Sequence, residues 1–245
     1  MTAVKLKCGA EERTYYRYVP PQYKPSQPVP LVIMLHGAGG NGPQTDRMTR
    51  WSALAEKAGF IVAYPHGGNW PGIYDWSDGN QDDAFLLAVI DEIKKGFSLD
   101  TERIYMCGYS YGGSMAATFA FRHAELLAAL ALVSPAWMQA DPRFDIDPYK
   151  ITQPKVPLPV FVWRGEYEFW PSAGEIDALI EYWTDFNQTK KTPRIVEELI
   201  YKTFIYEGGK AEVRYTEIED GVHSSFCGDD FAKIWYDFFT RQKRL

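Results

Sequence analysis

Residues 104–116 read IYMCGYSYGGSMA, and this stretch gives the strongest indication of the fold of the chain. Its first four residues have the apolar, β-prone character of a buried strand, and the small residues at its end are compatible with a helix. Between them, residues 108–112 match the pattern G-x-S-x-G. In a strand–turn–helix context this pattern places a serine on a sharp turn above the sheet, and glycines allow strand and helix to approach closely. The stretch therefore predicts a nucleophilic Ser110.

The segments on both sides of this stretch alternate between strand and helix patterns. Strands are predicted at 14–19, 31–35, 60–64, 127–133, 159–163, 199–206 and 213–218, and helices at 45–58, 82–97, 111–123, 173–187 and 231–239. The last two strands flank Gly208-Gly209 and are expected to pair. Such alternation predicts an α/β fold, with a mostly parallel central sheet covered by helices on both faces. We expect one domain over 1–245, with the connection at 134–157 as its cap or lid.

The composition fits a globular α/β domain and narrows the partners. The chain has 245 residues, of which 46% are hydrophobic and 24% charged. A net charge of −6 argues against nucleic acid or an anionic membrane as partner. No apolar run is long enough to cross a bilayer, and the first residues lack the apolar core of a signal peptide, which indicates a cytoplasmic protein or a secreted domain without its leader. The three cysteines form no metal-ligand spacing, and a bridge between Cys8 and Cys227 stays open.

A nucleophilic serine needs a base to take its proton and a third group to orient that base. In α/β-hydrolases these residues follow the chain order serine, acid, histidine. His36 and His66 precede Ser110, and His123 lies at the far end of the helix after it, about 1.5 Å per residue away from the turn. The base is therefore predicted to be His223, in the loop before the last helix.

The acid should follow the strand between these two residues. Glu166 and Glu168 both come after the 159–163 strand, and spacing on an extended segment does not separate them. Asp177 and Asp220 are the next alternatives. A tetrahedral intermediate also needs amide donors for its oxyanion. We expect these to be the backbone N–H groups of Tyr111, directly after the nucleophile, and of Ala38, in the glycine-rich loop after Leu35.

The same glycine-rich loop offers a function from another class. Gly37, Gly39 and Gly42 spell G-x-G-x-x-G after a strand, the pattern of a dinucleotide-binding oxidoreductase. Pro43 follows where the helix should already pack, and no acidic residue for a ribose ends the next strand, which reads AYPH at 63–66. A third alternative is a hydrolase fold that only binds, but here every catalytic role can be filled.

Several longer motifs identify a resemblance over most of the chain. They are LHGAGGNG at 35–42, AYPHG at 63–67, QDDAFLLAVID at 81–91, DTERIYMCGYSYGGSMA at 100–116, FRHAELLAALALVSP at 121–135 and GGKAEVRYTEIEDGVH at 208–223. With these motifs in this order, the chain resembles the polyhydroxybutyrate depolymerase-like esterases of the α/β-hydrolase superfamily, a group that includes feruloyl and acetyl xylan esterases. The resemblance implies a serine esterase that acts on carboxylic esters without a metal or organic cofactor.

The resemblance also assigns roles to individual residues. It makes Ser110 the nucleophile and His223 the base, and it puts the acid three residues after a glycine, so that Gly165 points to Glu168. The family usually has His-Gly and an aspartate in this segment, whereas this chain has Arg164-Gly165 and a glutamate.

The substrate is expected to be a small or oligosaccharide-linked ester with a feruloyl-type, acetyl or hydroxyalkanoate acyl group. The resemblance implies these acyl groups. Tryptophans in the loops that would surround the nucleophile fit them, since aromatic side chains suit an apolar pocket or a sugar-stacking platform. These tryptophans are Trp70, Trp76, Trp137 and Trp170.

Overall fold

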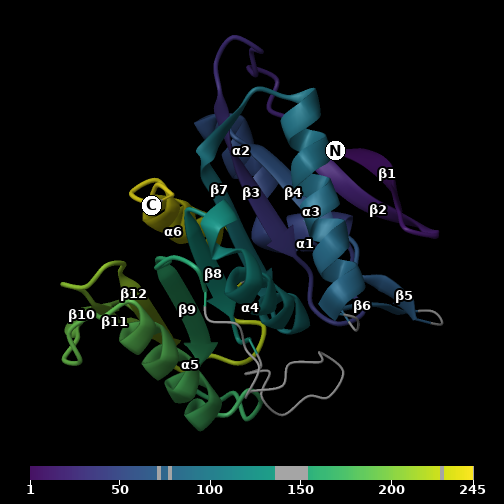
Figure 1. Ribbon diagram of the computed structural model, residues 1–245. Coiled ribbons are helices and arrows are strands. Elements are labelled where there is room, and N and C mark those ends of the chain that lie inside the picture. Colours follow the sequence, from purple (N-terminus) through teal and green to yellow (C-terminus); the bar gives the residue numbers. More distant parts are fainter. Residues whose placement is uncertain (71–72, 77–78, 136–153, 227–228, 245) are drawn as a thin grey trace.

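The chain folds around one large sheet. A computed structural model describes residues 1–70, 73–76, 79–135, 154–226 and 229–244. Its ten-stranded sheet has the order β1-β2-β4-β3-β7-β8-β9-β12-β11-β10 (Figure 1). The central strands from β4 through β12 pair in parallel, and antiparallel pairs extend the sheet at both edges. The predicted mostly parallel α/β sheet is thus confirmed for the part of the sheet that carries the site.

The elements have the following bounds. The strands of the large sheet are β1 (Thr2–Cys8), β2 (Glu11–Tyr18), β3 (Val29–Leu35), β4 (Ile61–Pro65), β7 (Leu99–Tyr109), β8 (Ala129–Val133), β9 (Val160–Gly165), β10 (Arg194–Glu198), β11 (Tyr201–Tyr206) and β12 (Val213–Ile218). A separate hairpin consists of β5 (Gly68–Trp70) and β6 (Ile73–Asp75). The helices are α1 (Gly42–Thr49), α2 (Trp51–Ala58), α3 (Gly79–Gly96), α4 (Tyr111–His123), α5 (Ala173–Phe186) and α6 (Asp229–Phe239), with a short 3-10 turn η1 (Ala124–Leu126).

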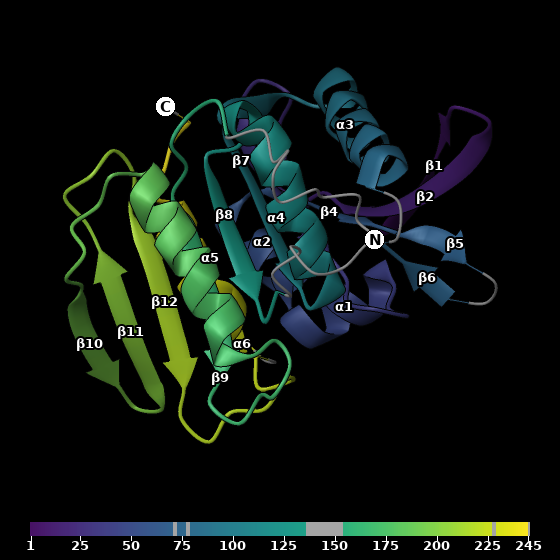
Figure 2. The same cartoon turned by 60° about the horizontal axis from the view of Figure 1, so that its bottom comes forward.

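The central strands are apolar throughout because both faces of the sheet are covered. In β3, Leu31, Ile33 and Leu35 belong to one buried cluster, and Val32 and Met34 to the other. Helices α3, α4 and α5 cover the first face, and α1, α2 and α6 cover the second (Figures 1 and 2).

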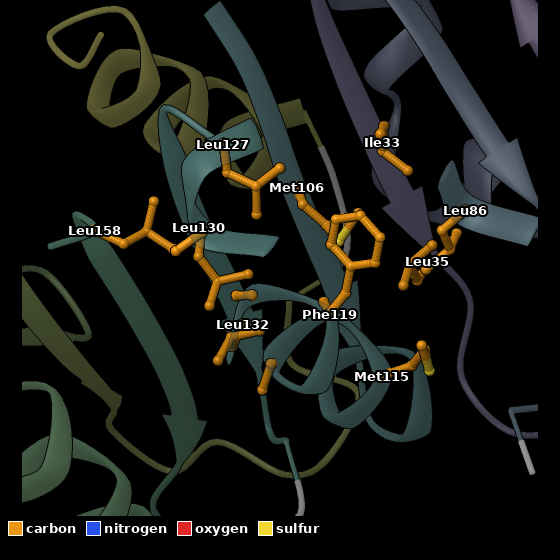
Figure 3. Packing of buried hydrophobic residues seen from close by; sticks show 14 of the residues in the cluster. Ile33, Leu35, Leu86, Met106, Met115, Phe119, Leu127, Leu130, Leu132 and Leu158 are labelled. Carbon is orange, nitrogen blue, oxygen red and sulfur yellow. The ribbon is translucent and has the colours of Figure 1, made fainter. Parts of the chain in front are cut away.

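The first cluster joins neighbouring strands through one helix. Phe119 of α4 lies among Leu35 of β3, Met106 of β7 and Leu132 of β8 (Figure 3). All four side chains are fully buried. This packing fixes α4 against the strand that carries Ser110 at its end, so the turn between them has a rigid base.

Several features differ from the sequence prediction, among them the hairpin of β5 and β6, where a loop was expected. The helix expected over 45–58 is two helices, because Arg50 adopts a left-handed conformation, with φ 59°, between α1 and α2. The strands β1 and β10 were not predicted, since most of their residues are exposed and carry no buried pattern. The strand predicted at 199–206 begins only at Tyr201, and its predicted pairing with the 213–218 strand is confirmed.

Two further sequence predictions concern residues that the structure does not describe. Most of the expected lid, residues 136–153, is among these residues. Cys8 is a free thiol, and Cys227 lies outside the described residues. Among the helices that the structure describes, none combines the length and the apolar character needed to cross a membrane.

Candidate active site

Ser110 occupies a strained turn between β7 and α4. Its backbone has φ 54° and ψ −123°, a combination that a serine adopts only where the surrounding structure holds it. Its N–H donates to the Val133 carbonyl at 2.9 Å, and its carbonyl accepts from the Ser114 N–H at 2.9 Å. A Cβ atom on Gly112 would overlap the His36 carbonyl oxygen, so glycine is required where α4 meets the end of β3. The turn therefore fixes the serine side chain at the carboxyl edge of the sheet.

His223 and Glu168 form a hydrogen-bonded pair at the same edge. His223 Nδ1 lies 2.8 Å from Glu168 Oε2. The other oxygen, Oε1, accepts from the Ser134 hydroxyl at 2.7 Å and from the Gly165 N–H at 2.6 Å. The Glu168 side chain is 1% exposed, whereas that of His223 is 34% exposed. A buried carboxylate thus orients a histidine whose ring still reaches the surface.

These partners determine the charge of Glu168. Burial by itself would raise the pKa of the carboxyl, but the hydrogen bonds from His223, Ser134 and Gly165 outweigh it, so the pKa lies below the ordinary glutamate value. The carboxylate is therefore ionised at neutral pH. An ionised carboxylate on Nδ1 stabilises the positive charge that the ring acquires when it accepts a proton.

Arg164 holds the loop of the acid. Its guanidinium is buried and donates hydrogen bonds to the carbonyl oxygens of Glu168 and of Pro171. A Cβ atom on Gly165 would lie 2.5 Å from the carbonyl carbon of Gly221, so the loop after β9 contacts the loop that leads to His223. Arg164, which stands where the family usually has a histidine, therefore helps to hold Glu168 in place.

The other acidic candidates are more exposed than Glu168. Glu166 is exposed, and its Oε2 accepts the backbone N–H of Asp220 at 3.1 Å. Asp177 and Asp220 are also exposed. Of these four carboxylates, only Glu168 combines burial with a hydrogen bond to the predicted base.

The glycine-rich loop between β3 and α1 lies against Ser110. A Cβ atom on Gly37 would come within 2.9 Å of the Tyr109 ring and 3.4 Å of the Ser110 Cβ. The Gly37 carbonyl accepts from the Gly40 N–H at 3.0 Å, which closes the loop, and Gly39 has φ 68°. Ala38, at the tip of this loop, is exposed.

A small cavity opens beside this loop. Its volume is about 220 Å³, and Gly37, Ala38 and Gly40 form one wall. The remainder is lined by the apolar or aromatic side chains of Met34, Met48, Tyr109 and Phe226 and by the polar residues Gln44, Thr45 and Thr49 of α1. Tyr109, the residue before Ser110, lines this cavity, so the cavity can hold part of a molecule that is bound at Ser110.

Aromatic rings surround the histidine. The ring centroid of His223 lies 5.0 Å from that of Tyr109 and 6.1 Å from that of Trp170. Trp170 in turn lies 5.7 Å from Tyr111. The residues on either side of Ser110 therefore link its turn to the histidine and to Trp170. Phe169, next to Trp170, is 93% exposed.

The four predicted substrate-binding tryptophans have different positions. Trp170 is partly exposed beside His223, as expected for a residue at the rim of the site. Trp76 is fully buried and donates its indole N–H to the His36 carbonyl at 2.7 Å, so the expectation that it contacts substrate does not agree with its burial. The side chain of Trp70 and the whole of Trp137 lie outside what the structure describes.

Ser134 is a site residue that the sequence analysis missed. It follows β8 and has φ 46°, which turns its hydroxyl onto Glu168. The available signal was a Ser-Pro pair directly after a buried strand, at the edge where β7 and β9 also end. His123, excluded by its distance along α4, hydrogen-bonds Asp83 at 2.7 Å. Within the described ranges, no three His, Cys, Asp or Glu side chains are grouped to hold a metal ion.

Comparisons with known proteins show the family and the fold of this chain. The family model described as esterase PHB depolymerase matches residues 13–141. The bifunctional acetylxylan esterase/xylanase XynS20E of Neocallimastix patriciarum is 35% identical over 102 residues, which cover 41% of this chain and 15% of that protein. Feruloyl esterase B of Neurospora crassa is 29% identical over 128 residues, which cover 49% of this chain and 42% of that protein.

A solved structure extends the likeness to the whole fold. The acetyl xylan esterase from Aspergillus awamori superposes with a TM-score of 0.80, and the match covers 97% of this chain and all of that one at 16% identity. At that identity the likeness concerns the fold, which is that of an α/β-hydrolase. The two sequence relatives above are each matched over less than half of their own length. The comparisons give no support to a dinucleotide-binding function.

Proposed function

This chain belongs to the esterase PHB depolymerase family, and from that premise we propose that it hydrolyses carboxylic esters through an acyl-enzyme on Ser110. His223 is the general base and acid, and Glu168 is the residue that orients it. The backbone N–H groups of Tyr111 and Ala38 are the donors for the oxyanion. The names of the relatives, which are acetylxylan and feruloyl esterases, support the reaction class.

The reaction follows from these roles in two half-reactions. His223 Nε2 takes the hydroxyl proton as Ser110 Oγ attacks the ester carbonyl, and the carbonyl oxygen becomes an oxyanion. The C–O bond of the ester then breaks, and the departing alcohol takes the proton from His223. A water molecule repeats the attack on the acyl-enzyme, with His223 again accepting a proton, and the acid leaves as Ser110 Oγ regains its hydrogen.

One observation carries the proposal. His223 shares a 2.8 Å hydrogen bond with a fully buried, ionised glutamate at the strand edge where Ser110 stands on its strained turn. A buried carboxylate is costly to the fold unless it is paired and hydrogen-bonded, and here three donors converge on it. This arrangement fixes the Nδ1–H tautomer, which leaves Nε2 as the proton acceptor.

The acyl group is proposed to occupy the cavity beside Ala38. A cavity of about 150 Å³ is large enough for benzene, so a volume of about 220 Å³ has room for an acetyl, hydroxyalkanoate or single-ring acyl group. Phe169 and Trp170 provide exposed aromatic surface for the other half of the ester.

A panel of esters tests the class and the pocket together. We expect p-nitrophenyl acetate and butyrate and methyl hydroxycinnamates to be hydrolysed, and long-chain p-nitrophenyl esters to react poorly because the cavity is small. Met48→Trp should lower kcat/KM for the hydroxycinnamates more than for acetate, since it fills that cavity. Absence of hydrolysis across the panel would contradict the proposed function, and an unchanged acyl preference in Met48→Trp would contradict the proposed pocket.

A further inference from the structure

Two loops beside Ser110 hold each other through their histidines. The first loop, residues 36–42, joins β3 to α1 and begins with His36. The second, residues 65–68, leaves β4 and contains His66. His36 Nε2 accepts the backbone N–H of Gly67 at 2.9 Å, and His66 Nε2 accepts the backbone N–H of Gly42 at 3.0 Å. Each ring thus binds an amide of the loop that carries the other ring.

His36 is held in one tautomer. Its Nδ1 lies 2.7 Å from the Gly37 carbonyl oxygen, which can only accept, so Nδ1 carries the hydrogen and Nε2 is the acceptor for Gly67. The ring lies 4.9 Å from that of Trp76, whose indole N–H donates to the His36 carbonyl. His36 is 1% exposed.

His66 is anchored from the other side. Its backbone N–H donates to the Thr14 carbonyl at 3.0 Å, and its own carbonyl accepts from the guanidinium of Arg13 at 3.0 Å. Arg13 is buried and paired with Asp82 at 2.5 Å. The rings of His66 and His36 are 6.0 Å apart and nearly perpendicular. The second loop is therefore fixed to the sheet, and the first loop is fixed to the second.

These contacts set the direction of the Ala38 amide. The Gly37 carbonyl accepts from His36 Nδ1 and from the Gly40 N–H, so its direction is fixed. A trans peptide unit is planar, and its C=O and N–H point in opposite directions. The Ala38 N–H consequently points away from His36 and Gly40.

We propose that His36 and His66 are positioning residues that form a reciprocal clamp, which aims the Ala38 N–H at the oxyanion. The proposal rests on the esterase function proposed above. It gives the two histidines that precede Ser110 in the chain a role in transition-state stabilisation, without contact with the substrate. A preorganised donor stabilises the oxyanion because no reorganisation is needed when the charge develops.

The clamp requires neutral rings, because a protonated Nε2 would donate instead of accepting. Burial, with smaller contributions from the nearby His66 and Arg13, lowers the pKa of His36 to about 4. Burial and Arg13 likewise lower the pKa of His66. The guanidinium of Arg13, which pairs with Asp82, lies close enough to act on both rings, and the ring of Tyr16 lies 5.0 Å from that of His66. The positive charge of Arg13 thus helps to keep both rings neutral at the pH where an esterase works.

Removal of the acceptor nitrogens tests the clamp. His36→Phe and His66→Phe keep a planar ring but leave the Gly67 and Gly42 amides without acceptors. We expect kcat for p-nitrophenyl acetate to fall on the order of 10–100-fold in each, less than the 10²–10³ lost with an oxyanion donor itself. KM should change by less than about threefold, because the ground-state carbonyl gains little from the donor.

Two further variants separate positioning from general stability. His36→Gln places an oxygen acceptor at the depth of Nε2 and should recover most of kcat. His123→Phe removes a histidine hydrogen bond of similar length at the far end of α4, so it should lower the melting temperature and leave kcat unchanged. If His36→Phe does not fold, His66→Phe and His36→Gln provide the same comparison.

A double variant tests whether the clamp is one unit. His36→Phe/His66→Phe should lose little more kcat than the worse single variant, since residues that act together are not additive. If the wild type is active and His36→Phe and His66→Phe both keep kcat within about twofold, as His123→Phe should, the clamp is wrong. The proposed esterase function is then unaffected. A wild type that cleaves no ester overturns the function itself.

Discussion

His223 and His36 lie on two loops that approach Ser110, and their surroundings differ in charge. His223 bonds to the carboxylate of Glu168, and a third of its side chain is exposed. His36 is buried and bonds to two backbone groups, the Gly37 carbonyl and the Gly67 amide. A carboxylate favours the charged imidazolium, whereas burial among backbone dipoles favours the neutral ring. A histidine is therefore placed to accept a proton on one side of the serine, and another histidine is placed to stay neutral on the other side.

This difference teaches that a histidine near a nucleophile is not identified as a base by proximity. Its hydrogen-bond partners decide what it can do. The roles of His223 and His36 can be tested separately. That of His223 depends on the charge of Glu168, and that of His36 depends on the direction of backbone N–H groups.

The largest effect should come from Ser110, the proposed nucleophile that lies between these two histidines. Ser110→Ala removes the hydroxyl and little packing, so we expect kcat to fall by about 10⁴–10⁶ while the melting temperature stays close to that of the wild type. Initial rates with p-nitrophenyl acetate and a thermal melt measure both. Retention of a tenth of the wild-type rate would exclude Ser110 as the nucleophile.

The next largest effect should distinguish the two glutamates after β9. Glu168→Gln removes the charge that supports the protonated His223, and kcat should fall by about 10³–10⁴ with little change in KM. Glu166→Gln is the matched control, because Glu166 is exposed and bonds to a backbone amide. It should stay within about tenfold of the wild type. An exchange of these two outcomes would make Glu166 the acid.

The two sides should also separate in the pH dependence of stability. The pKa of His36 is lowered from 6.5 to about 4, so the unfolded chain binds a proton at higher pH than the folded chain, and stability should fall as the pH drops from about 6.5 to 4. This loss amounts to roughly 3 kcal/mol. The pKa of Glu168 is also lowered, and its contribution is lost only as the pH falls below the ordinary glutamate value of 4.5.

Urea unfolding between pH 7 and pH 3 measures these contributions. His36→Gln should reduce the decline between pH 6.5 and 4, leaving the part due to His66, whose pKa is also lowered, and Glu168→Gln should reduce it only at lower pH. Equal slopes in wild type and His36→Gln over the upper window would show that His36 is not held neutral by the fold.

The smallest effect concerns Ser134, which hydrogen-bonds Glu168. A hydrogen bond to a charged group contributes about 1.5–3 kcal/mol, and two other donors remain in Ser134→Ala. We expect the pKa of Glu168 to rise towards its ordinary value and kcat to fall less than about tenfold. Thr203→Val, which removes a hydroxyl bond to Thr216 on β12, is the control and should leave kcat unchanged. If Ser134→Ala and this control have the same kcat, Ser134 does not support the acid.

The sequence by itself determined the family and the fold, and it supplied Ser110, His223 and Glu168 of the candidate site but not Ser134. The apolar runs of β3, β7 and β8 predict strands buried on two faces, and G-x-S-x-G predicts the turn at Ser110, because both signals are local. The edge strands β1 and β10 escaped prediction because exposed residues carry no such periodicity.

The resemblance pointed to Glu168 through its spacing from Gly165, but only the tertiary structure shows how Glu168 and Glu166 differ in their surroundings. The two differ in burial and in partners contributed by Ser134, Gly165 and His223, which lie on three different segments. It also gave His36 and His66 their partners, because the loops 36–42 and 65–68 meet only when β3 and β4 pair side by side. A side chain's charge and direction depend on neighbours that are distant in the chain, and no local pattern in the sequence encodes them.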